Sequence, residues 1–281
     1  MDYINLIDYI DKYNLSDKIY PSDIDCYINI PDYNFVYNKL WLSKSQKMLC
    51  GPMGVYPAKY PIIFKPIVNL YGLSRGFKII HDIDEYDLEK KDGFFWQPYF
   101  EGKHIVCDFV LDNTKIIFSS CLRSYPGEKG SFKLHHTTKY EIPKNIIDWI
   151  NTNMKNYRGC LNMDVIDGNI IECHLRLNGD FNLYNKEFCF QLSDFMEGKI
   201  ETIDYKIPKI YIFPVFIERE HLERFVQKKT IIKKLLKKCS KTIYFDDVDA
   251  EYQAQLLRVL VFDTYNFLDG LKLQKFINNN I

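Results

Sequence analysis

Acidic side chains are placed symmetrically in residues 161–180, whose pattern predicts a β-hairpin. Asp167-Gly168 is a turn signal with alternating apolar and polar residues on both sides. Asp164 and Glu172 lie four residues before and after Gly168, so we expect them to face each other across the hairpin. Opposed carboxylates repel unless a positive charge lies between them. A Mg²⁺ ion, completed by water and nucleotide phosphates, would supply that charge.

The same face of this hairpin carries further polar side chains. Because alternate residues of a strand share a face, Asn162 opposes His174, and Arg176 follows on the same side. Asn162 remains an alternative to Asp164 as the first metal ligand. The competing interpretation is an exposed polar face of an edge hairpin. The apolar residues around the turn argue instead for packing into a core; they are Val165, Ile166, Ile170 and Ile171.

A second candidate site lies at residues 62–76. The run Ile62-Ile63-Phe64 predicts a short buried strand that leads into Lys65, and a loop with two glycines follows. Glycine lets backbone N–H groups approach phosphate oxygens, and a lysine held on a strand supplies a fixed positive charge. This combination favours phosphate binding, although a surface hairpin with an ordinary lysine has the same pattern.

A third segment, residues 94–104, runs from apolar residues into Gln97-Pro98-Tyr99-Phe100 and then Glu101-Gly102. A purine can lie against such an aliphatic and aromatic segment while backbone groups read its edge. Taken alone, the pattern is more often a strand and a turn.

Together and in this order, the three segments resemble the ATP-grasp superfamily, which includes D-alanine–D-alanine ligase, biotin carboxylase and carbamoyl-phosphate synthetase. In that family a strand lysine precedes a glycine-rich loop over the phosphates. A hinge follows, and then a hairpin with an acidic residue and the sequence Glu-x-Asn-x-Arg. The resemblance covers roughly residues 40–182 and rests on Lys65-Pro66, on residues 72–76, on residues 97–102 and on residues 172–176.

The resemblance implies how a nucleotide would be bound. Lys65 and an upstream lysine would contact phosphate; Lys44 is the better match for the upstream lysine, and Lys47 is the alternative. The loop and hinge residues that the resemblance implies for ATP are Gly72, Ser74, Arg75, Gly76, Gln97, Tyr99, Phe100 and His104.

The resemblance also implies metal ligands and catalytic side chains. Asp164 and Glu172 would bind Mg²⁺ or Mn²⁺, with His174 standing where the family has asparagine. Imidazole suits Mg²⁺ poorly beside hard oxygen ligands. Arg123, in front of a loop at residues 126–130, would close over the site, or else that loop is simply solvated. The catalytic residues implied are Arg176, Lys65 and Arg123.

The implied activity is that of an ATP-dependent ligase that joins a carboxylate to an amine through an acyl phosphate. Two alternatives stay open: a small-molecule kinase of the same fold, and a non-catalytic nucleotide-binding or interaction protein that keeps the fold. The sequence identifies neither the carboxylate nor the amine, and it leaves a homo-oligomeric state open.

The elements that must position these residues predict an α+β fold. The resemblance implies two α+β subdomains with antiparallel sheets that clasp ATP. We expect a reduced N-terminal segment (1–43), an ATP-grasp core (44–196) and an α/β, largely helical C-terminal extension (197–281). Helices are predicted from Lys44 with Ser43 as N-cap, over 143–154, over the basic stretch 219–239, over 250–262 and near 271–277.

Composition excludes some classes of function. The 281 residues contain 37 Lys+Arg and 37 Asp+Glu, so a protein devoted to non-specific nucleic-acid binding is not expected. No run of about 20 apolar residues predicts a membrane span. Residues 1–11 lack the basic start of a secretory leader, so we expect a cytoplasmic protein. Abundant Tyr, Phe, Asn, Ile and Lys suggests an AT-rich genome such as that of a large virus, and the location would then be the host cytoplasm.

Overall fold

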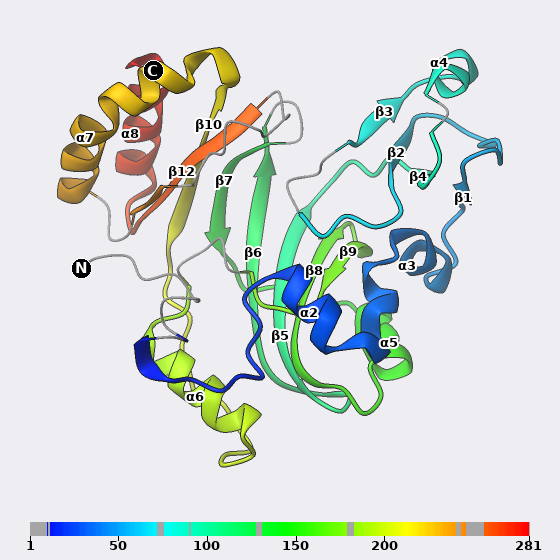
Figure 1. The fold of residues 1–281 in the computed structure, drawn as a ribbon, viewed down its shortest axis with the longest axis horizontal. Coiled ribbons are helices and arrows are strands. Elements are labelled where there is room, and N and C mark those ends of the chain that lie inside the picture. Colours follow the sequence, from blue (N-terminus) through cyan, green and yellow to red (C-terminus); the bar gives the residue numbers. More distant parts are fainter. Residues whose placement is uncertain are drawn as a thin grey trace.

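The computed structural model describes residues 10, 12–71, 76–89, 91–127, 131–178, 183–239, 243–245 and 256–280. Two antiparallel sheets form the fold, with helices packed on their faces (Figure 1). The small sheet has four strands in the order β1-β4-β2-β3, and the large sheet has eight in the order β11-β12-β10-β7-β6-β5-β8-β9. The predicted α+β class is therefore confirmed. No helix in these described ranges is both long and apolar enough to cross a lipid bilayer.

The first four strands of the chain form the small sheet, and all later strands form the large sheet. The small sheet consists of β1 (Gly51–Pro52), β2 (Ile62–Pro66), β3 (Lys78–Ile80) and β4 (Phe94–Pro98). The large sheet consists of β5 (His104–Asp112), β6 (Lys115–Pro126), β7 (Phe132–Thr137), β8 (Arg158–Ile166), β9 (Asn169–His174), β10 (Tyr211–Glu218), β11 (Ile243–Phe245) and β12 (Leu256–Thr264). The helices are α2 (Asp23–Asn29), η1 (Pro31–Tyr37), α3 (Lys39–Ser45), α4 (Ile83–Leu88), α5 (Lys144–Asn153), α6 (Lys186–Met196), η2 (Arg219–His221), α7 (Leu222–Cys239) and α8 (Phe267–Asn280).

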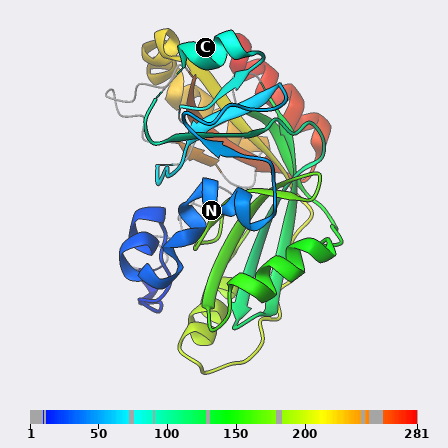
Figure 2. The same ribbon diagram turned by 90° about the vertical axis from the view of Figure 1, so that its right-hand side faces the viewer.

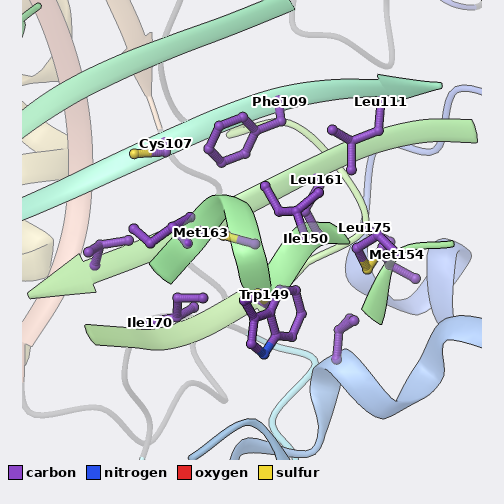
Figure 3. Packing of buried hydrophobic residues seen from close by; sticks show 14 of the residues in the cluster. Cys107, Phe109, Leu111, Trp149, Ile150, Met154, Leu161, Met163, Ile170 and Leu175 are labelled. Atoms are coloured by element: carbon purple, nitrogen blue, oxygen red, sulfur yellow. The ribbon is translucent and has the colours of Figure 1, made fainter. Parts of the chain in front are cut away.

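The main core lies between the large sheet and α5. Cys107 and Phe109 of β5 point toward this helix, as do alternate residues of β8 such as Met163 (Figure 3). Trp149 and Ile150 of α5 fill the space above them, with exposures of 4% and 0%. Because side chains alternate along a strand, the intervening residues of β5 and β8 lie on the opposite face of the sheet, where the candidate site is found.

The small sheet turns one face toward α4 and the other toward the large sheet. Ile62 and Phe64 of β2 pack with Tyr86 of α4 in a separate core. The alternate residues Ile63 and Lys65 therefore face the β8–β9 hairpin. Both views of the fold place the small sheet beside this hairpin (Figures 1 and 2).

Two predicted helices were wrong. The predicted helix from Lys44 is α3, which begins at Lys39 with Asn38 as its N-cap; the Asn38 Oδ1 accepts a hydrogen bond from Trp41 N at 2.9 Å. The second helix was predicted over 250–262, but strand β12 (Leu256–Thr264) begins within this range and lies between β11 and β10. This run is apolar on both faces, and such a run does not distinguish a buried strand from a buried helix by its period.

The predicted domain boundaries cross continuous structure. The boundary after residue 43 falls inside α3. Cys26 and Tyr37, from the predicted reduced N-terminal segment, belong to the main core. Strands β10, β11 and β12, from the predicted C-terminal extension, continue the large sheet, while α7 and α8 supply the helical part.

A glycine in α8 makes the packing of this extension testable. A Cβ added to Gly270 would lie 2.1 Å from Phe213 Cε2 and 2.7 Å from Thr264 Cγ2. Alanine normally stabilises a helix interior relative to glycine. Here we expect Gly270→Ala to destabilise the protein by about 1–3 kcal/mol, because overpacking against the buried Phe213 ring outweighs helix propensity. Denaturant unfolding measures the loss, and Lys272→Ala on the exposed side of α8 is the control; an unchanged midpoint for Gly270→Ala would contradict this packing.

Candidate nucleotide and metal site

A cavity of about 490 Å³ lies between the two sheets. The small sheet contributes Ile63, Lys65 and Ile79, and the large sheet contributes Ile166 and Ile171. Five residues predicted from the sequence line this one cavity: Lys65, Tyr99, Phe100, His104 and Glu172. Its lining combines apolar and aromatic side chains with lysine and carboxylate groups.

The predicted pairing of the β8–β9 hairpin is confirmed. Asp164 pairs with Glu172, and Asn162 pairs with His174, with a bulge immediately after Asp164. All four residues lie on the face of the sheet opposite α5. The side chains of Asp164 and Glu172 are 23% and 16% exposed, so neither is sealed into the core.

Two buried lysines surround Glu172. Lys39 Nζ lies 2.7 Å from Glu172 Oε1, and Lys65 Nζ donates to the carbonyl oxygen of Ile171 at 3.0 Å. Lys39 and Lys65 are only 5% and 7% exposed. The two ammonium groups therefore supply positive charge at the place where the sequence predicted a need for it.

The electrostatic environment of this cluster shifts the pKa of both a lysine and a glutamate. The pKa of Lys65 is lowered to about 7, first by burial and then by the neighbouring Lys39. Burial alone would raise the pKa of Glu172, but Lys39, His174 and Lys65 lower it to about 2. Glu172 is thus firmly ionised, while Lys65 is only partly protonated near pH 7 and can take up a proton when an anion approaches.

A second cluster joins the N-terminal segment to the end of β9. Asp23 of α2 accepts hydrogen bonds from His174 Nδ1 at 3.0 Å and from Arg176 Nη2 at 2.8 Å. His174 Nε2 lies 3.6 Å from Glu172 Oε1. Burial opposes ionisation of Asp23, but His174 and Arg176 hold its pKa below the usual value. Arg176 therefore follows His174 at the end of β9, and its guanidinium group is ion-paired with Asp23.

His104 brings an unpaired nitrogen to the cavity. Its Nε2 is buried, has no hydrogen-bond partner and lies 3.5 Å from Asp164 Oδ1. The ring packs edge-on against Phe132, with centroids 5.1 Å apart. A buried polar atom without a partner is costly in a protein, so a ligand that supplies a partner would be favoured here.

Several predicted site residues are not brought to this cavity. Arg123 pairs with Ile105 and His136, which places it on the α5 face of the sheet, opposite Asp164. Its predicted catalytic position is therefore corrected. Its guanidinium lies 5.4 Å from the centroid of the Tyr125 ring instead.

The upstream lysine is also corrected. Lys44 and Lys47 are both exposed, and neither lines the cavity, whereas Lys39 does. Gln97 is buried on β4, and its Oε1 accepts from Ser43 Oγ at 2.9 Å rather than facing the cavity. Gly76 is described and has φ +75°, as a glycine turn requires. The remaining loop residues predicted to bind phosphate, Gly72, Ser74 and Arg75, lie outside the described residues.

Sequence reasoning missed Lys39 and Asp23. For Lys39 a local signal existed, because Asn38 is a favoured N-cap residue and predicts a helix that starts at position 39. For Asp23 the pattern Ser22-Asp23-Ile24-Asp25 indicates a helix start, which the structure has. No local pattern indicates that Asp23 faces residues about 150 positions later.

The side chains of Asp164, Glu172 and His174 offer atoms that can bind a divalent cation, but the three do not lie close enough together to bind the same ion. Among the described residues, the ligand atoms of Asp164, Glu172 and His174 do not all lie within 4.8 Å of one another. An ion would be held by Glu172 with Asp164 across the hairpin, or by Glu172 with His174 along β9. One or two carboxylates, with phosphate and water, are the set that Mg²⁺ usually takes from a protein.

Two sheets that enclose a lysine- and carboxylate-lined cavity define the ATP-grasp fold, and comparison with solved structures agrees. The carboxyaminoimidazole ribonucleotide synthase of Aspergillus clavatus, complexed with ATP, superposes with a TM-score of 0.61 and 10% identity over 88% of this chain and 74% of that one. The L-amino acid ligase of Bacillus licheniformis gives 0.58 and 10% identity over 96% and 75%.

A third similar structure is the N5-carboxyaminoimidazole synthetase of Staphylococcus aureus, complexed with ADP. It gives a TM-score of 0.61 and 10% identity over 88% of this chain and 72% of that one. No family model matches the sequence, and no curated protein matches it. The chain therefore has the ATP-grasp fold, which it shares with carboxylate–amine ligases.

Proposed function

We propose that the protein is an ATP- and divalent-metal-dependent ligase that joins a carboxylate to an amine through an acyl phosphate. The observation that carries this proposal is the convergence of Lys39, Lys65 and Glu172 on one cavity between the two sheets. Apolar and aromatic side chains also line this cavity and are suited to a purine. Cationic groups for the phosphates, together with apolar and aromatic groups for the base, are the chemistry that a nucleotide requires.

The nucleotide would lie along the cavity. The base would pack between Ile63, Ile166 and the segment at Tyr99 and Phe100, all of which line the cavity. The phosphates would then extend toward Lys65 and Lys39. The unpaired His104 Nε2 would receive a hydrogen bond from a hydroxyl group or donate one to an acceptor, depending on its tautomer.

The chain's own residues would stabilise the charge that develops during transfer. Lys39 and Lys65 would neutralise oxygens of the phosphoryl group as it moves to the substrate carboxylate. Glu172, with Asp164 or His174, would hold the divalent ion, which when bound polarises the phosphates and offsets their charge. Arg176, which is ion-paired with Asp23 and does not line the cavity, would have to reorient to contact the acyl phosphate or its oxyanion. The amine would then displace phosphate from the carbonyl carbon.

Nucleotide binding is the first test. A ligand that binds only the folded state raises its melting temperature by mass action. We expect millimolar Mg·ATP or Mn·ATP to raise it, and GTP to do so less. The absence of any shift with either metal complex would overturn the nucleotide-binding part of the proposal.

Product analysis is the second test. Mixtures of carboxylates and amines, incubated with ATP, should release ADP and phosphate together with an amide. ADP with a phosphorylated product instead would identify a kinase. Nucleotide binding without turnover across such mixtures would favour the non-catalytic alternative.

A further inference from the structure

Asp23 holds two functional side chains with one carboxylate. Oδ1 lies 3.0 Å from His174 Nδ1, and Oδ2 lies 2.8 Å from Arg176 Nη2. The Asp23 residue is 3% exposed, so these are its partners rather than solvent. Both contacts span about 150 residues of sequence and join α2 to the end of β9.

The helix that carries Asp23 is fixed on β9. Ser22 caps α2 by accepting a hydrogen bond from Asp25 N at 3.1 Å. Cys26 Sγ donates to the carbonyl oxygen of Leu175 at 3.3 Å, and Leu175 N donates to Tyr37 Oη at 3.2 Å. The residue between His174 and Arg176 is therefore held on both its backbone groups, which leaves Asp23 little freedom to move away.

This arrangement decides which nitrogen of His174 is available. An ionised carboxylate only accepts hydrogen bonds, so Nδ1 carries a proton, and a cation that displaces the other ring proton would bind to the lone pair of Nε2. Nε2 points to Glu172 Oε1 at 3.6 Å. Two ligands of one six-coordinate ion with bonds near 2.1 Å lie about 3 Å apart, so the pair is close to the spacing that a shared ion requires.

We propose that Asp23 is a positioning residue that presents His174 Nε2 beside Glu172, so that the site prefers Mn²⁺ to Mg²⁺. The inference rests on the proposed function, because the ion would accompany ATP. Imidazole nitrogen binds Mg²⁺ poorly, whereas Mn²⁺ accepts both carboxylate and imidazole ligands. A carboxylate that accepts from the far nitrogen is the usual outer partner of a metal-binding histidine.

Pulsed electron paramagnetic resonance on Mn²⁺ bound with ATP tests the ligand directly. We expect ¹⁴N modulation from a coordinated imidazole in the wild-type protein and its loss in His174→Asn. Asp23→Asn places an amide N–H toward Nδ1, which moves the ring proton to Nε2. We expect this variant to lose the modulation as well and to weaken Mn²⁺ affinity by about tenfold. Asp25→Asn, on the same helix, is the matched control and should keep the signal.

Calorimetric titration of ATP in Mn²⁺ and in Mg²⁺ gives an independent result. Tighter binding with Mn²⁺, and a ratio that falls toward one in His174→Asn, supports the inference. ATP binding of equal strength with both ions, without ¹⁴N modulation in the wild-type protein, would overturn it while the proposed function stands. Failure of ATP to bind with either ion would overturn both. The wild-type spectrum decides the ligand even if Asp23→Asn does not fold.

Discussion

Replacing Lys65 by methionine is expected to weaken ATP binding by about 10- to 100-fold, because a charge-assisted hydrogen bond contributes roughly 1.5–3 kcal/mol. The ammonium group is buried, lines the cavity and is anchored on the carbonyl oxygen of Ile171. Calorimetric titration with Mg·ATP and Mn·ATP measures the loss. Lys44→Met is the control, because Lys44 is an exposed lysine on α3 that does not line the cavity. Equal losses in the two variants would remove Lys65 from the site.

The same substitution should leave the fold at least as stable at pH 6. Burial lowers the pKa of Lys65 to about 7, so the folded state binds this proton less readily than the unfolded chain. The cost of the buried charge is full below pH 7 and disappears as the pH rises toward the unfolded value of about 10.5. The free energy of unfolding of the wild-type protein should therefore increase as the pH rises above 7, and that of Lys65→Met should lack this increase.

Three charged neighbours also act on the pKa of Lys65. Lys39 lowers its pKa, whereas Glu172 and Asp164 raise it. Because Glu172 remains ionised down to about pH 2, it does not itself titrate between pH 6 and 10. Unfolding in urea at several pH values, wild type against Lys65→Met, isolates the contribution of this lysine. A Lys65→Met variant less stable than the wild type at pH 6 would show that the cation stabilises the fold.

The β8–β9 hairpin was predictable from its local turn signal, whereas the bulge that completes its register was not. A two-residue turn at Asp167-Gly168 pairs Ile166 with Asn169 and Val165 with Ile170, and counting outward from it would place Asp164 opposite Ile171. The bulge between Asp164 and Val165 shifts the register by one residue, so Asp164 pairs with Glu172, as the count about Gly168 predicted. Lys65 was predictable for a similar reason, because the short apolar run before it specifies a strand and its end.

The residues from outside the hairpin required information that no local pattern contains. Arg123 lies on the wrong face because its orientation depends on how β6 pairs with β5, and a shift of one residue exchanges the two faces. Asp23 faces His174 only because α2 packs across the end of β9. Lys39 was missed through a helix placed five residues too late, which made Lys44 seem the upstream lysine. In each case the element was approximately predictable, and its packing partner was not.

Replacing Glu172 by glutamine is expected to cost about 3 kcal/mol of stability at pH 7, because it leaves buried ammonium groups without their counter-ion. Lys39 Nζ lies 2.7 Å from the carboxylate, with a side chain that is 6% exposed. Lys39→Met should cost less, since Lys65 still compensates Glu172. The double variant Lys39→Met/Glu172→Gln removes both charges and should recover most of the loss, so the two substitutions are not additive.

A matched pair on the surface supplies the control for this cycle. Lys199 and Asp194 lie 3.3 Å apart, with side chains that are 64% and 47% exposed. Their coupling, measured with Lys199→Met and Asp194→Asn, should be below about 0.5 kcal/mol. The Lys39–Glu172 coupling should also decline as the pH falls from about 4.5 toward 2, because protonation of Glu172 removes its stabilising charge. Additive losses for Lys39 and Glu172 would show that the two side chains do not form a buried ion pair.

The same cycle separates the role of Glu172 in folding from its role at the site. If Glu172 only compensates lysines, the double variant should recover stability and should bind ATP with the same affinity and metal dependence as Lys39→Met. If Glu172 also holds the divalent ion, stability should return while the difference between ATP affinity with and without metal stays lost. Replacing Lys39 should have the opposite effect, because it removes a phosphate contact and leaves the Glu172 carboxylate free for the divalent ion. Affinity for ATP should then fall in Lys39→Met while its dependence on metal increases.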